Sequence, residues 1–147
     1  MRLQAHGIGL DLPAGWDGRI WARPESGPVL HAANVSLPAD DGDFATLATS
    51  TLPADGVVVV LVDYGPADAG TPLFSASAPT AIDAGELSPA ALLHRRPGQR
   101  GLQRFFTSAG RAMCLYVVVG SETHAADLAA GVSGVLRTLL VTPATGR

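Results

Sequence analysis

The chain has 147 residues, of which 47% are hydrophobic and 16% are charged, so global disorder is excluded and we expect a single domain over residues 1–147. The formal net charge is −3, and all ten basic residues are arginine. This balance gives no general attraction to nucleic acid or acidic membranes, and the absence of lysine indicates a GC-rich, actinobacterial source.

The N-terminal part of the chain predicts short strands separated by glycine and proline turns. Residues 3–12 alternate weakly around Gly7 and Gly9, which favours a single edge strand. Residues 19–23 and 29–37 predict the next two strands, because each lies between Pro- or Gly-containing turns.

A short helix and a buried strand follow an acidic turn. Residues 44–52 carry Phe44, Leu47 and Ala48 at helical spacing, and Asp43 is expected to cap this helix through its carboxylate. Residues 56–64 (GVVVVLVDY) form an apolar run that is typical of a strand buried on both faces. We place this strand in the centre of the sheet.

The segment 65–101 is the least regular part of the chain, because five prolines are spaced through it. Residues 72–76 and 81–87 are expected to add edge strands, since proline limits pairing to one side. A long connection of this kind in a compact domain usually carries structure or function of its own.

Residues 101–141 contain the strongest signals. Residues 102–107 and 112–119 predict an antiparallel hairpin around a Ser108-Ala109-Gly110 turn, and the second strand is apolar enough to be buried on both faces. An apolar stripe then predicts a helix capped by Ser121 or Thr123, with Gly131 and Gly134 approaching the sheet closely. The stripe consists of Leu128, Val132, Val135, Leu136 and Leu139.

Together these elements predict an α+β fold. We expect a twisted antiparallel sheet of about six strands, with the long C-terminal helix on one face and the short 44–52 helix on the other. No apolar leader and no stretch of roughly 20 apolar residues is visible. We therefore expect a cytoplasmic protein without a membrane span.

This order of elements, with the sequence LPAGW at residues 12–16, resembles the PsbP-like superfamily. The resemblance covers most of the chain and implies an α/β/α sandwich. Members include extrinsic subunits of photosystem II, a Ran-binding import factor and actinobacterial lipoproteins, which mostly act by binding or scaffolding. The chain departs from the lipoprotein branch because it has no lipobox cysteine after an apolar leader.

Motifs for catalysis and cofactors are weak. The four histidines are widely spaced and Cys114 lies inside an apolar run, so we expect neither a metal site nor any other cofactor, and Cys114 is interpreted as a small buried side chain. The Gly7-Ile8-Gly9 sequence lacks the rest of a dinucleotide fingerprint, and no serine lies in a G-x-S-x-G motif. The sequence assigns no catalytic residue.

The most distinctive charge pattern is the basic cluster around Arg95, Arg96, Arg100 and Arg104, with Arg111 further along. Guanidinium groups beside Phe105 and Phe106 are suited to binding phosphate or carboxylate. The alternative is an arginine face that pairs with acidic residues of the same chain. Residues 1–91 hold three arginines and eleven acids, whereas residues 92–147 hold seven arginines and two acids.

We predict a non-enzymatic domain that binds another protein or assembles with itself. The predicted contact residues are Arg95, Arg96, Arg100 and Arg104, with Trp16 and Trp21 as aromatic anchors if they are exposed and as core residues otherwise. The alternative is a small-molecule binder or enzyme that uses a cleft beside residues 65–101.

Overall fold

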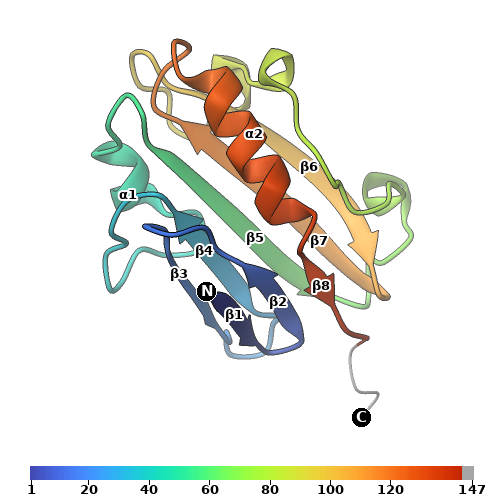
Figure 1. Ribbon diagram of the computed structural model, residues 1–147. Helices are drawn as coiled ribbons and strands as arrows, with labels where there is room; N and C mark the ends of the chain where they lie inside the picture. Colours follow the sequence, from blue (N-terminus) through green and yellow to red (C-terminus); the bar gives the residue numbers. More distant parts are fainter. Residues whose placement is uncertain (144–147) are drawn as a thin grey trace.

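The computed structural model describes residues 1–143 and shows an α+β architecture with two antiparallel sheets (Figure 1). The larger sheet contains, in spatial order, β3 (Asp17–Trp21), β4 (Val29–Ala33), β5 (Val57–Gly65), β7 (Arg111–Val119) and β6 (Arg100–Ser108). The smaller sheet contains β1 (Arg2–Ala5), β2 (Ile8–Asp11) and β8 (Leu140–Val141). The α+β class is confirmed, but the single six-stranded sheet is replaced by two sheets.

The difference begins at the N-terminus, where residues 3–12 form a hairpin instead of one edge strand. Ala5 pairs with Ile8, and the intervening His6 and Gly7 both have positive φ, at 52° and 81°. This is the geometry of a tight two-residue hairpin turn, which usually carries Asn-Gly or Asp-Gly. β2 then pairs with β8, a short strand that the sequence analysis did not predict.

The two central strands agree with the predictions. β5 and β7 pair from Val57–Val119 to Gly65–Ala112, and nearly every residue of both strands is buried. Alternate side chains enter two separate hydrophobic clusters, so that Val57 and Val59 face one side and Val58 and Val60 face the other. The valine-rich runs are therefore buried on both faces.

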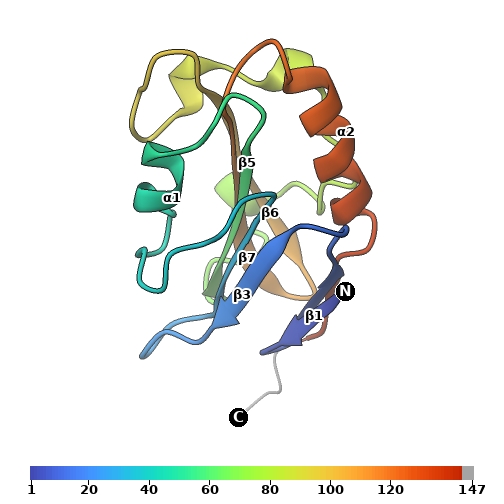
Figure 2. The same cartoon turned by 60° about the vertical axis from the view of Figure 1, so that its left-hand side comes forward.

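A helix covers each face of the larger sheet, as Figure 2 shows. The helix α2 (Ala125–Leu136) packs with the smaller sheet on one face, and the helix α1 (Thr46–Ser50) packs on the other. Val132 of α2 is completely buried, while Leu128 at the edge of the predicted stripe is half-buried. No helix in residues 1–143 is long and apolar enough to cross a membrane.

Several predicted helix details were wrong. The helix α1 is shorter than residues 44–52, and Asp41 instead of Asp43 accepts hydrogen bonds from its first turn, from the backbone N–H groups of Leu47 and Ala48 at 2.5 and 2.9 Å. The N-cap of α2 is His124 without a side-chain hydrogen bond, in place of Ser121 or Thr123.

The two glycines of α2 do not approach the sheet. A Cβ atom at Gly131 would have the Trp16 ring as its nearest neighbour, at 4.0 Å, and a Cβ atom at Gly134 would lie 3.8 Å from the Arg137 guanidinium. Neither distance is closer than ordinary van der Waals contact. The prediction of close approach was wrong, because the larger buried side chains of α2 set its distance from the sheet.

The proline-rich segment forms turns in place of the edge strands predicted at residues 72–76 and 81–87. It contains three short 3₁₀ helices, η1 (Pro72–Phe74), η2 (Ala84–Glu86) and η3 (Pro89–Ala91). Single backbone contacts join it to β6, where Ser88 bridges Gly101 and Thr107 N–H donates to Ala76 O at 3.0 Å. Proline removes the donors that a continuous ladder needs, so the segment covers the edge of β6 without extending the sheet.

Two titratable side chains, those of Cys114 and His31, lie in the core. Cys114 is 1% exposed, and burial raises the pKa of its thiol to about 11, which confirms its prediction as a small buried side chain. His31 is also 1% exposed, and its Nε2 donates to the backbone carbonyl of Asp43 at 2.8 Å. Burial lowers the pKa of His31 below its ordinary value of 6.5.

His31 therefore makes stability depend on pH. The unfolded chain binds a proton at His31 at a higher pH than the folded chain, so the free energy of unfolding falls as the pH drops below about 6.5. The substitution His31→Gln keeps an N–H donor for Asp43 O but cannot titrate. We expect a smaller loss of stability between neutral and mildly acidic pH in this variant, measured by urea denaturation. Identical pH slopes in the two proteins would exclude His31 as the source.

Candidate functional site

Three of the predicted arginines meet in a hollow at the end of the sheet where β6 and α2 begin. The hollow has a volume of about 650 Å³, and we call it the arginine hollow. Its lining comes from the start of η3, the loop that follows η3, the first residue of β6 and the loop that precedes α2. The lining residues are Pro89, Arg95, Arg96, Pro97, Gly98, Gln99, Arg100, Ser121, Glu122 and Thr123.

The arginines of this hollow are only partly neutralised by the chain itself. Arg100 Nη2 lies 3.1 Å from Glu122 Oε2, and Arg96 Nη1 donates a long hydrogen bond of 3.4 Å to Thr49 Oγ1 of α1. Arg95 is exposed and forms no ion pair within residues 1–143. Three guanidinium groups therefore face a single carboxylate.

A buried amide lies next to these charges. Gln99 is 6% exposed, and its Nε2 donates to the backbone carbonyl of Thr49 at 2.6 Å. Its Oε1 atom is buried and has no hydrogen-bond partner within the described part of the chain. Buried polar atoms usually have a partner, so the hollow combines several strong donors with one unused acceptor.

The other predicted contact residues lie elsewhere. Arg104 is paired with Glu86 of η2 and lies four residues along β6 from Arg100, a distance of about 13 Å. Trp16 is half-buried against the α2 side of the core. Trp21 is half-buried on the α1 side and meets the His31 ring edge-on, at 4.6 Å between centroids. The structure brings neither tryptophan to the arginine hollow.

A second hollow, which we call the polar cleft, lies at the opposite end of β5 and β7. Its volume is about 740 Å³, within the usual range for small-molecule sites. It is formed where the β1–β2 turn, the β3–β4 turn, the end of β5, the start of β7 and the end of β8 meet. Its lining includes His6, Gly7, Glu25, Ser26, Gly27, Asp63, Tyr64, Gly65, Pro66, Arg111 and Thr142.

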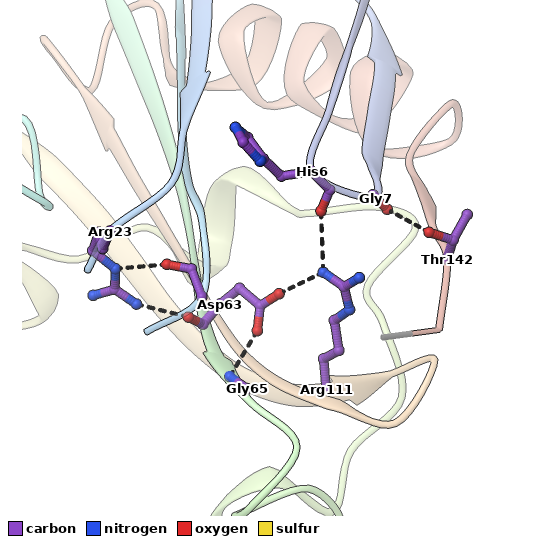
Figure 3. Close-up of polar contacts among 8 residues, drawn as sticks. His6, Gly7, Arg23, Asp63, Gly65, Arg111 and Thr142 are labelled. Atoms are coloured by element: carbon purple, nitrogen blue, oxygen red, sulfur yellow. Dashed lines mark hydrogen bonds and ion pairs between the residues drawn. The ribbon is translucent and has the colours of Figure 1, made fainter. Parts of the chain in front are cut away.

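A buried ion pair forms part of the lining of the polar cleft (Figure 3). Arg111 Nη1 donates to Asp63 Oδ2 at 2.8 Å and to the backbone carbonyl of His6 at 3.3 Å. Asp63 Oδ1 accepts from the N–H of Gly65 at 2.7 Å. Asp63 is 1% exposed and Arg111 is 8% exposed, so the pair is almost completely removed from solvent.

A local irregularity in β5 aims a tyrosine at this cleft. Asp63 pairs with Met113 and Gly65 pairs with Ala112, which leaves Tyr64 as an extra residue in a β-bulge. Bulges redirect side chains and are frequent beside functional sites. Tyr64 is 38% exposed, burial raises the pKa of its hydroxyl, and the Arg23 guanidinium lies 6.0 Å from its ring centroid.

Arg23 fixes the β3–β4 turn against the polar cleft. Its guanidinium donates to Gly27 O at 2.8 Å and to the backbone carbonyl of Asp63 at 2.7 Å, and it pairs with Asp43 at 3.0 Å. Close approach also requires glycine at two positions. A Cβ atom at Gly27 would lie 2.3 Å from Asp63 O, and one at Gly7 would lie 2.6 Å from Arg111 Nη2.

Sequence reasoning grouped Arg111 with the basic cluster and did not select Asp63. The strand register separates Arg111 from the basic cluster. Arg100 pairs with Val119 at one end of the β6–β7 hairpin, whereas Arg111 lies at the other end, about 27 Å away. The sequence does contain a signal for the Asp63–Arg111 pair. Asp63 ends one apolar run and Arg111 begins another, and adjacent antiparallel strands bring such positions together.

The acidic turn at residues 40–43 forms a third, smaller hollow of about 340 Å³ beside His31. Two of its three carboxylates have structural partners, since Asp41 accepts from the N–H groups of α1 and Asp43 pairs with Arg23. Within residues 1–143, no three His, Cys, Asp or Glu side chains are grouped so as to hold a metal ion.

Comparisons of the chain with protein-family models, curated proteins and solved structures give no match. The resemblance to the PsbP-like superfamily therefore stays a prediction. The two hollows and the residues that line them are the features of this chain that indicate a function.

The ion pair of the polar cleft is expected to be strongly coupled. Removing one partner by Asp63→Val or Arg111→Met leaves a buried charge unpaired, which lowers the free energy of unfolding by about 3–5 kcal/mol. The double variant removes both charges and is expected to be close to the wild type. Urea denaturation of the four proteins measures the coupling directly.

The exposed pair Arg2–Asp11, at 3.3 Å, provides the control. Its variant Arg2→Met is expected to change stability by no more than about 0.5 kcal/mol. Additive losses in the double variant of the cleft would contradict the proposed coupling.

Proposed function

We propose that this chain is a non-enzymatic binding domain that holds an acidic segment of a partner protein in the arginine hollow. The observation that carries the proposal is the imbalance of charge in the hollow. Arg95, Arg96 and Arg100 line it together, and Glu122 is the one carboxylate among its lining residues. A surface with unneutralised guanidinium groups attracts carboxylates and binds them through paired hydrogen bonds.

The surroundings of the hollow fit a peptide segment better than an isolated ion. Gln99 also lines the hollow, and its buried Oε1 acceptor has no partner within the described residues. Leu93, two residues before Arg95 in sequence and outside the lining of the hollow, is 47% exposed and offers apolar contact area to a segment that extends beyond the hollow. Arginine is also among the commonest residues at the energetic centre of protein interfaces.

The partner is either a different protein or a second copy of this chain. A second copy is a reasonable source of an acidic segment, because residues 1–91 contain eleven acids and three arginines. Nucleic acid is a poorer candidate, since the whole chain carries a net charge of −3.

A small-molecule binder remains the second candidate function, and a specific observation favours it. The polar cleft touches the 65–101 segment at Gly65 and Pro66 and contains a buried arginine with an unpartnered Nε. The two functions use opposite ends of the same sheet and do not exclude each other.

The arginine hollow is tested with a fluorescein-labelled oligo-glutamate peptide and fluorescence anisotropy. We expect binding that weakens with added salt, because the charges lie at the surface. Arg95→Gln and Arg96→Gln are each expected to weaken binding about fivefold, which corresponds to roughly 1 kcal/mol for one surface charge pair. The matched control is Arg137→Gln, an exposed arginine at the other end of α2. Equal effects of all three substitutions would contradict the assignment of the hollow.

Light scattering of the purified protein distinguishes the two kinds of partner. Measurements at ionic strengths of about 0.01 M and about 0.15 M compare Debye lengths of about 30 Å and about 8 Å. A larger species that dissociates at the higher salt, and that Arg95→Gln abolishes, identifies a second copy as the partner. A monomer in both conditions excludes a second copy and leaves a different protein as the proposed partner.

A further inference from the structure

We propose that the polar cleft binds a small monocarboxylate through the free edge of the Arg111 guanidinium. This site is independent of the arginine hollow, because it lies at the opposite end of β5 and β7 and shares no lining residue with it. Its dimensions suit a small molecule and not a folded partner.

The donors of Arg111 are only partly used by the protein. Within residues 1–143 its guanidinium donates hydrogen bonds through Nη1 alone, to Asp63 and to His6 O. Nε is buried without a partner, and Nη2 donates no hydrogen bond to the described residues. An arginine that is 8% exposed normally satisfies its donors. The Nε and Nη2 donors therefore have no acceptor within the described residues, and a ligand that reaches this edge of the guanidinium from the cleft would supply one.

The orientation of this edge is fixed by the protein. In Figure 3 the Asp63 carboxylate approaches the guanidinium from one side, while Thr142 lies on the other. Gly7 packs directly against Nη2, where any larger side chain would cover it. The Nε and Nη2 hydrogens of a guanidinium are parallel and match the two oxygens of a carboxylate. A ligand carboxylate here would share Arg111 with Asp63.

The remaining charges limit the ligand class. Asp63 already balances Arg111, and Glu25 lies on the same lining. The Arg23 guanidinium contacts the backbone of Asp63 but is paired with Asp43. Because the lining carries two carboxylates and one guanidinium, it repels a dianion such as phosphate more strongly than a monocarboxylate, so a monocarboxylate is favoured.

Tyr64 suggests the nature of the rest of the ligand. Tyr64 lies in the β-bulge and lines the cleft, and the residue is 38% exposed. An exposed aromatic face next to a polar anchor favours a ligand with a flat apolar body. Benzoate is therefore the probe of choice, and benzamide is its matched control, because it has the same ring but no negative charge.

The experiment is a titration of the ¹⁵N-labelled protein with benzoate, followed by the NMR signal of the Arg111 Nε–H group. This signal is assigned through its proximity to Gly7 and Thr142. We expect a saturable shift with benzoate, a much smaller one with benzamide, and weaker binding of phosphate than of benzoate. An Arg111 Nε–H signal that benzoate leaves unchanged in the wild-type protein overturns the proposal without any variant.

Variants then test the geometry. Arg111→Lys keeps a positive charge for Asp63 but removes the paired donors, and we expect at least a tenfold loss of benzoate affinity. Arg104→Lys, at an arginine paired with Glu86 outside the cleft, is the control and is expected to bind as the wild type. If Arg111→Lys does not fold, Tyr64→Ala replaces it, with a loss of affinity for benzoate but not for acetate.

Unchanged benzoate affinity in both cleft variants would refute the site. Arg95→Gln is expected to bind benzoate normally, since it affects only the arginine hollow. Failure of the carboxylate site and failure of the proposed acidic-peptide function are thus observed in separate experiments.

Discussion

The burial of both faces of β5 and β7 is the constraint on which the rest of the structure depends. Their valine-rich segments present apolar side chains to both sides, and a sheet of this kind is stable only when both faces are covered. α2 and the smaller sheet cover one face, and α1 with its flanking loops covers the other. The three-layer arrangement in Figure 2 follows from the composition of two strands.

The same constraint determines where polar chemistry is found. Charged groups are costly in the middle of a ladder that is buried on both faces, and the charged residues of these two strands, Asp63 and Arg111, lie where their pairing ends. The opposite end carries the arginine hollow, formed by the loops that lead into β6 and α2. Both candidate sites therefore lie at the ends of the sheet, where loops converge and the backbone is no longer fully paired.

The elements that could be predicted from the sequence are those with a local signal. The apolar runs at 56–64 and 112–119, the hairpin turn before Arg111 and the stripe of α2 all lie within short windows, and the structure contains each of them. The loop of Arg95, Arg96 and Arg100 could also be selected locally, because these residues are close in sequence. That Arg104 lies outside the hollow could not be predicted, because it depends on the side-chain packing around β6.

The features that were missed depend on contacts distant in sequence or on unusual turn residues. Asp63 and Arg111 are separated by 48 positions, so their pairing required the strand register. The β1–β2 hairpin was read as one strand because His-Gly occupies a turn that Asn-Gly or Asp-Gly normally fills. β8 has two residues, too few to produce a periodic pattern. Asp41 and Asp43 are equally good caps in sequence, and Arg23 decides between them by pairing with Asp43.

The two sites differ in how much their charged groups contribute to the stability of the fold. Arg95 is exposed and makes no ion pair within the described chain, so the loss of its charge is expected to have little effect on stability. Arg111 is held by Asp63 in a nearly solvent-free position, and removing its charge affects the core as well. A buried pair of this kind is no more stabilising than well-packed apolar side chains of similar size. The pair lies beside the polar cleft, and the unpartnered Nε of Arg111 is the feature on which the proposed carboxylate site depends.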